Sequence, residues 1–143
     1  MDQTLKNKII LIIGGYLISV LFGSTFFLLF LFSPYFLPSV DFYYYFGLFA
    51  LLVLSFLSYY IVIYLAIRKF NLNTTKHILS VIIPIIIIQI IASLFLVLIS
   101  DNSTFDTPKT IDVFANVVSM IIGIIIALVS TFISIKILKR KKN

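Results

Sequence analysis

Four long apolar stretches constrain this chain more than any other feature of its sequence. They cover residues 9–32, 42–67, 78–99 and 111–138. An α-helix needs about 20 apolar residues to cross the hydrocarbon core of a bilayer, and each stretch is at least that long. Because the segments between the stretches are short, we expect residues 1–143 to form a single transmembrane domain with no extramembrane domain.

The apolar stretches are expected to be helices. A strand of a membrane barrel alternates polar and apolar residues over about ten positions, whereas residues 82–88 show no such alternation. Hydrocarbon offers the backbone no hydrogen-bond partner, so an unbroken apolar span must satisfy its own N–H and C=O groups as a helix. Apolar residues make up 62% of the chain and charged residues 11%, where a soluble domain has roughly 45–50% and 25%. The expected fold class is an all-α integral membrane protein, a bundle of four transmembrane helices.

The basic residues predict the orientation of this bundle. Ten of the eleven Lys and Arg residues fall on one side of a four-pass chain, and Lys109 alone falls on the other side with four of the five aspartates. Cytoplasmic segments carry the excess of Lys and Arg, so both termini are expected in the cytoplasm. The ten residues are Lys6, Lys8, Arg68, Lys69, Lys76, Lys136, Lys139, Arg140, Lys141 and Lys142.

Tyrosines flank the second stretch at both ends. Tyr43, Tyr44 and Tyr45 lie at its outer end, and Tyr59, Tyr60 and Tyr64 lie toward its inner end. A ring with a polar tip is stable among lipid headgroups. Both sets are therefore expected to anchor the helix at the two membrane surfaces.

Residue usage bears on the location of the protein. Ile, Phe and Asn are frequent, and Lys outnumbers Arg nine to two, a usage typical of AT-rich genomes. We therefore expect the plasma membrane of a low-GC Gram-positive bacterium, with the lipid bilayer as the main partner. The basic C-terminal end is expected to lie against anionic headgroups. Nucleic-acid binding is not expected, because no folded basic platform supports that short segment.

The stretches contain few side chains that could carry chemistry. The chain has no Cys and one His, so it offers neither a thiol nucleophile nor an ordinary zinc site. Catalysis inside a membrane usually needs ionisable groups that face a cavity, and none lies between the ends of the four stretches. We therefore expect no enzymatic activity, no cofactor and no bound metal.

Three polar residues are candidates for a site within the membrane: Gln89, Asp112 and Asn116. An unpaired amide is costly in hydrocarbon, so Gln89 and Asn116 should face other helices, either as structural hydrogen bonds or as contacts to a substrate. Asp112 lies near the outer end of the fourth stretch. Either it marks the first turn of that helix, where the helix dipole favours an anion, or it forms a cation or partner site with Asn116, one turn deeper.

Small residues recur at every fourth position in two stretches. Small side chains let helix backbones approach closely, which promotes association in lipid. The stripe of the fourth stretch is therefore expected to contact the first helix along most of its length, so a bulky residue at its centre should be disruptive. The same stripe could instead join copies of the chain in a homo-oligomer. The residues are Gly15, Ser19 and Gly23 in the first stretch and Ala115, Ser119, Gly123, Ala127 and Thr131 in the fourth.

Two groups of small four-helix membrane proteins are similar to this chain in size and topology. Small drug exporters carry an acidic residue in the first helix, whereas residues 9–32 contain no charge, which disfavours proton-coupled export by that mechanism. The chain also resembles GtrA-like proteins in length, topology and the glycines Gly14 and Gly15 of the first helix, without a diagnostic motif. This resemblance implies a role in moving or placing lipid-linked sugars.

Two functions of different classes stay open. The favoured one is a non-enzymatic membrane protein that acts through helix contacts, as an accessory subunit of another membrane protein or as an immunity-type protein. It needs no ionisable site. The alternative is a small oligomeric transporter or lipid-linked-sugar flippase, whose path would be lined by Pro84, Gln89 and Asn116.

Overall fold

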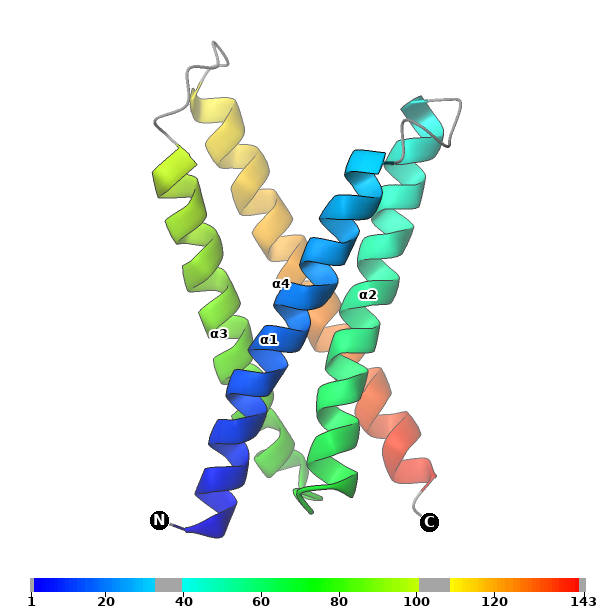
Figure 1. Cartoon of the computed structure of the whole chain (residues 1–143), viewed down its shortest axis with the longest axis vertical. Coiled ribbons are helices and arrows are strands. Elements are labelled where there is room, and N and C mark those ends of the chain that lie inside the picture. Colours follow the sequence, from blue (N-terminus) through cyan, green and yellow to red (C-terminus); the bar gives the residue numbers. More distant parts are fainter. Residues whose placement is uncertain (1, 33–39, 101–108, 142–143) are drawn as a thin grey trace.

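The computed structural model consists of four long α-helices (Figure 1). The structure describes residues 2–32, 40–100 and 109–141, and no strand occurs among them. An all-helical chain with four helices long and apolar enough to cross a membrane is therefore confirmed. The helices are α1 (Gln3–Phe32), α2 (Val40–Arg68), α3 (Thr75–Ser100) and α4 (Lys109–Arg140).

Each helix extends beyond the apolar stretch that predicted it. The shortest, α3, has 26 residues, and a rise of 1.5 Å per residue makes it about 39 Å long. That length exceeds the hydrocarbon thickness of roughly 30 Å. α1 begins at Gln3 rather than at residue 9, because a helix that leaves the hydrocarbon can continue through residues such as Lys6 and Lys8. The apolar stretches therefore mark the membrane-length part of each helix and not its ends.

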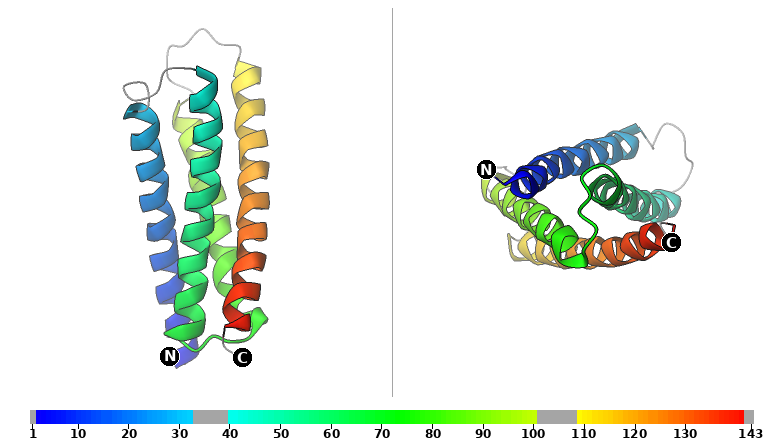
Figure 2. Two further views of the ribbon diagram at one scale, coloured as in Figure 1. Left: turned by 90° about the vertical axis from the view of Figure 1, so that its right-hand side faces the viewer. Right: turned by 90° about the horizontal axis from the view of Figure 1, so that it is seen from below.

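The helices form two pairs that separate toward one end. Both α1 and α4 pack against α2 and α3, and they hardly touch each other. Figure 1 shows the pair α1 and α2 diverging from the pair α3 and α4 toward the end opposite the termini. Both termini and the α2–α3 connection lie together at the other end (Figure 2). We call this the closed end, which contains Gln3, residues 68–75 and Arg140, and we call the opposite end the open end.

The buried core occupies the half of the bundle nearer the closed end. Going toward the open end, the last buried positions are Gly15 on α1, Ser58 on α2, Ile86 on α3 and Ala127 on α4. The described side chains beyond them are half-buried or exposed. Among the described side chains, close packing is therefore confined to this half. Among the most buried side chains, each at most 1% exposed, are Ile63, Ile78, Val81, Ile82 and Ile85.

A short connection holds α2 and α3 together at the closed end. The N–H of Phe70 donates to the carbonyl of Leu65 (3.0 Å), and that of Leu72 donates to the carbonyl of Ala66 (2.8 Å). These bonds satisfy carbonyl groups that the end of a helix leaves unpaired. Asn71 between them has a φ of 55°, a left-handed conformation that Asn adopts more readily than most residues. The connection therefore caps the end of α2 just before α3 begins.

The expected contact between α1 and α4 through their small residues is wrong for this structure. The two helices lie on opposite sides of α2 and α3. A Cβ atom added at Gly23 or at Gly123 would meet no atom within 4 Å, so neither glycine lies at a close helix contact. At the level of Gly23 and Gly123 the two helix pairs have already diverged. Small residues at this level leave more space between the helices.

The other members of the two stripes lie in different surroundings. Gly15 lies in a close contact with α2 and α3, and Ala127 and Thr131 are buried at 3% exposure. Ser19 is half-buried. The side chains of Ala115 and Ser119 lie outside the described residues. The stripe residues of α4 nearer the closed end, Ala127 and Thr131, are therefore packed, whereas the space beside Gly123 is empty of protein atoms.

Candidate functional site

A cavity of about 670 Å³ lies between the four helices where the core ends. All four helices contribute to its lining, and the lining residues continue from the core toward the open end. Ligand cavities in proteins usually have volumes of about 300–1,000 Å³, so this one is large enough for a small organic molecule or part of a lipid. It is the candidate functional site of the protein.

A close contact of three helices underlies this cavity at Gly15. A Cβ atom there would lie 2.5 Å from Cδ1 of Ile85 on α3 and 3.1 Å from Cγ2 of Val62 on α2. A side chain at this position would therefore push Ile85 aside. The lining residues Tyr59 and Ile86 lie within one turn of these contacts. The glycine lets α1 meet α2 and α3 directly beneath the cavity.

One hydrogen bond joins α2 to α3 within the lining. The hydroxyl of Tyr59 donates to Oε1 of Gln89 over 2.7 Å. Tyr59 is only 4% exposed, so the bond spares its hydroxyl the cost of being buried unpaired. The amide nitrogen of Gln89 makes no hydrogen bond to any described residue. Its two N–H groups are therefore available to a molecule in the cavity.

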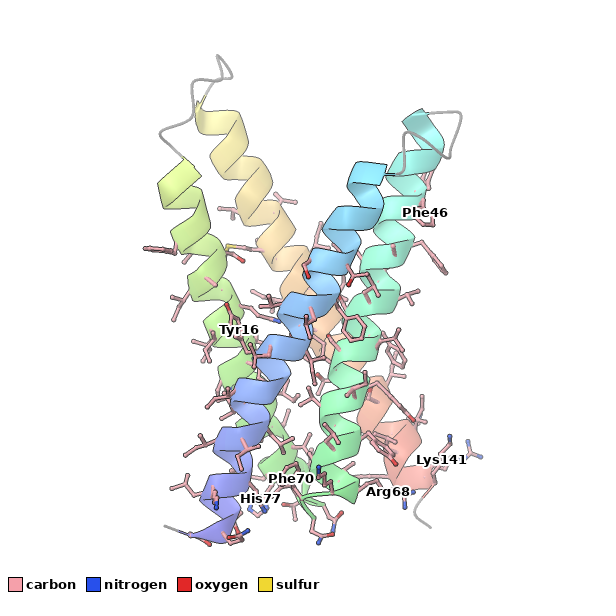
Figure 3. The ribbon with its side chains drawn as sticks, in the orientation of Figure 1. Tyr16, Phe46, Arg68, Phe70, His77 and Lys141 are labelled. Atoms are coloured by element: carbon pink, nitrogen blue, oxygen red, sulfur yellow. The ribbon has the colours of Figure 1, made fainter. Side chains whose placement is uncertain are left out.

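The other polar groups of the lining are hydroxyls. Ser19 donates to the carbonyl of Gly15 (3.0 Å), and Ser58 donates to the carbonyl of Ser55 (2.9 Å), which leaves both hydroxyl oxygens able to accept. Tyr16, about midway along the bundle in Figure 3, also belongs to the lining. All these residues come from α1 and α2.

The polar groups of the described lining come from three of the four helices. α3 adds Gln89 and Ser93 to the polar groups of α1 and α2. The described lining residues of α4 are apolar, namely Met120, Gly123, Ile124 and Ala127. Among the described lining residues, none carries a charge. Because apolar residues of all four helices surround these few polar groups, the described lining suits a molecule that is largely apolar and carries a neutral polar group.

The structure places one of the three polar candidates in this site and does not describe the side chains of the other two. Gln89 lines the cavity. Asp112 and Asn116 lie on α4, but their side chains are outside the described residues. Pro84 lies within α3, which continues through it, and it is absent from the lining. In the described part of the chain, no three His, Cys, Asp or Glu side chains are grouped as metal ligands would be.

Tyr59 is a site residue that the sequence analysis misplaced. It was expected at the membrane surface, whereas the structure buries it beside Gln89. The position of Tyr59 in the sequence could have predicted its burial, because it precedes Arg68, the last residue of α2, by nine residues. Nine residues of helix span about 14 Å, roughly half of the 30 Å hydrocarbon core. If α2 crosses a membrane, a tyrosine at that depth needs a hydrogen-bond partner within the bundle.

Buried hydroxyls on the inner half of α4 were also not anticipated. Ser134 donates to the carbonyl of Ser130 over 2.7 Å. Thr131 Oγ1 is buried and has no partner among the described residues. Ser130 and Ser134 are four residues apart and therefore lie on one helix face. This spacing was the sequence feature that could have predicted a polar face on α4. These groups lie below the cavity and are not part of its lining.

Comparison with known proteins assigns the chain to no family. No protein-family model matches it, and no curated protein or solved structure is significantly similar to it. What the cavity can hold is therefore inferred from its volume and lining. Hydroxyl and amide groups within a mainly apolar lining match a molecule that is itself part polar and part apolar.

Proposed function

We propose that this chain is a multi-pass plasma-membrane protein of a low-GC Gram-positive bacterium that takes a lipid-like amphipathic molecule between its helices, as a small transporter or flippase. Four helices of membrane length support the insertion. Ten of the eleven basic residues belong to the termini and the α2–α3 segment, which supports a cytoplasmic closed end. The open end then faces away from the cytoplasm.

The observation that carries the proposal is a cavity between membrane-length helices whose described lining residues are all uncharged. Burying an unpaired charge costs far more than burying a hydroxyl or an amide that finds a partner, so a neutral polar group is the better ligand for Tyr59 and Gln89. The apolar lining of α4 suits an acyl or prenyl chain. A glycosylated lipid combines both parts, which agrees with the lipid-linked-sugar function considered from the sequence.

Such transport needs no covalent step, so the proposal includes no catalytic residue and no cofactor. The other expected function, an accessory subunit or immunity-type protein acting through helix contacts, stays a prediction. Assembly into a homo-oligomer also stays a prediction. Exposed apolar residues on α4, such as Ile121, Ile125 and Phe132, would serve a partner helix as well as lipid.

Lipid movement can be measured in vesicles that contain the purified protein and a glucosyl diacylglycerol labelled with the fluorophore NBD. Dithionite bleaches only the outer-leaflet label of protein-free vesicles. We expect the protein to make the inner-leaflet label accessible too. Gly123→Leu should slow this loss of fluorescence, because its side chain would enter the cavity from an open position.

Gly14→Leu is the matched control. A Cβ atom at Gly14 would also meet nothing within 4 Å, and Gly14 does not line the cavity. Both changes gain about 1 kcal/mol of helix propensity, so they differ mainly in where the side chain lies. Inner-leaflet label that stays protected with the unchanged protein would contradict transport of this lipid. Equal rates for both variants would contradict the cavity as its path.

A further inference from the structure

The closed end carries basic residues that three helices bring together from distant parts of the chain. The guanidinium of Arg68, at the end of α2, donates to the backbone carbonyl of Lys141 over 3.4 Å. Nζ of Lys139, near the end of α4, donates to Oγ1 of Thr75, the first residue of α3, over 2.6 Å. Figure 3 shows Arg68 and Lys141 at this end of the bundle. The fold therefore gathers cations that the sequence separates.

These cations have no carboxylate partner. Arg68 and Lys139 both donate to neutral oxygen atoms, and no ion pair joins any of the described residues. The only acidic side chain that the structure describes is that of Asp2 on the N-terminal side of α1, where Oδ1 accepts a hydrogen bond from the N–H of Thr4. Like charges held together without a counter-charge repel one another, so an anion bound among them would stabilise the closed end.

The depth of the cluster indicates where that anion comes from. Arg68 ends the membrane-length segment of α2, Arg140 ends that of α4, and Thr75 begins that of α3. The ends of membrane-length helices lie at the level of the lipid headgroups. Basic clusters at this level on the cytoplasmic side bind anionic headgroups. The flat guanidinium of Arg68 can donate two hydrogen bonds to one phosphate.

We propose that these residues, here called the closed-end cluster, form a binding site for the phosphate group of an anionic phospholipid of the adjacent leaflet. A phosphate seated there would draw the ends of α2, α3 and α4 together. The site does not depend on what the cavity holds. The cluster consists of Arg68 and Lys139, which the two hydrogen bonds place, and of the described Lys and Arg residues within three positions of the bonded residues, namely Lys69, Lys76, Lys136, Arg140 and Lys141.

The proposal is tested with the full chain in neutral detergent micelles, by measuring Tm as dioleoyl phosphatidylglycerol or dioleoyl phosphatidylcholine is added. We expect phosphatidylglycerol alone to raise Tm. The double variant Arg68→Gln/Lys139→Gln should need about tenfold more phosphatidylglycerol, or more, for the same rise. The control Lys6→Gln/Lys8→Gln removes two cations from α1 at the same end and should respond like the unchanged protein.

A second double variant, Lys76→Gln/Arg140→Gln, removes two exposed cluster cations that make no hydrogen bond to any described residue. If the Arg68→Gln/Lys139→Gln variant does not fold, this second variant still tests the proposal. Its Tm should also rise less than that of the unchanged protein when phosphatidylglycerol is added. An equal weakening in the Lys6/Lys8 control would show that only net charge matters and would overturn the proposal. An equal rise in Tm with inorganic phosphate at the same concentration would show a free-phosphate site, which also overturns it.

Discussion

The hydroxyl of Tyr59 on α2 lies 2.7 Å from Oε1 of Gln89 on α3, at the level where the packed core gives way to the cavity. This bond links two helices that are otherwise joined mainly through the core below it and the connection at the closed end. It also fixes the side chain of Gln89 at the cavity while its N–H groups stay unpaired. One hydrogen bond therefore serves both the fold and the candidate site.

A double-mutant cycle measures what this bond contributes to the stability of the fold. We expect Tyr59→Phe and Gln89→Leu to lower the free energy of unfolding less together than the sum of their separate effects, because either change breaks the same bond. Hydrogen bonds between membrane helices couple by about 0.6 kcal/mol on average and up to about 1.7 kcal/mol. Unfolding in mixed micelles with increasing dodecyl sulfate measures the coupling. Strictly additive effects would show that the bond is absent in the folded protein.

The close contact at Gly15 predicts a sharp difference between two neighbouring glycines. Gly15→Val would drive its side chain into Ile85 and Val62, and overpacking of this kind costs about 1–3 kcal/mol. Gly14→Val meets open space and should change stability far less. Thermal unfolding of both variants in the same detergent makes the comparison. Similar Tm values would mean that α1 does not approach α2 and α3 as described.

Gly123 and Ala127 lie one turn apart on α4 but in opposite surroundings. We expect Gly123→Ile to be tolerated, because a Cβ atom there meets nothing within 4 Å. Ala127 is 3% exposed, so Ala127→Ile should destabilise the bundle by about 1–3 kcal/mol through overpacking. This expectation reverses the disruptive effect predicted for Gly123 from the sequence. Thermal unfolding distinguishes the two, and a lower Tm for Gly123→Ile than for Ala127→Ile would restore the original prediction.

The buried hydroxyl of Thr131 predicts a stabilising change. Its Oγ1 has no partner among the described residues, and an unsatisfied buried polar atom costs about 1–3 kcal/mol. Thr131→Val keeps the shape and removes this atom, so Tm should rise. Ser134→Ala, which removes a hydroxyl that already donates to Ser130, is the control and should not raise Tm. A fall in Tm for Thr131→Val would mean that the hydroxyl is hydrogen-bonded in the membrane.

The orientation can be tested by thiol labelling because the chain has no Cys. A cysteine at position 104, between α3 and α4, should react with a membrane-impermeant maleimide on intact cells. A cysteine at Asn73, in the α2–α3 connection, should react only after the cells are opened. The reverse pattern would place the closed-end cluster on the outer surface and overturn the proposed topology.

The sequence alone determined the helical fold class, the number of helices and the location of their membrane-length parts. These follow from a local rule, since hydrocarbon requires about 20 apolar residues per helix and a backbone that satisfies itself. The ends of the helices were less predictable. Residues such as Lys6 and Lys8 continue α1 beyond the apolar stretch, because nothing in a polar residue obliges a helix to stop at the hydrocarbon boundary.

Only the tertiary structure decided which face of each helix is buried. It placed Gly123 beside open space, Tyr59 against Gln89, and α1 against α2 and α3 instead of α4. In water, a helix reveals its buried face by an apolar stripe along an otherwise polar surface. A helix in lipid is apolar on every side, so its sequence carries little of that signal, and close packing and a few hydrogen bonds choose the partners instead.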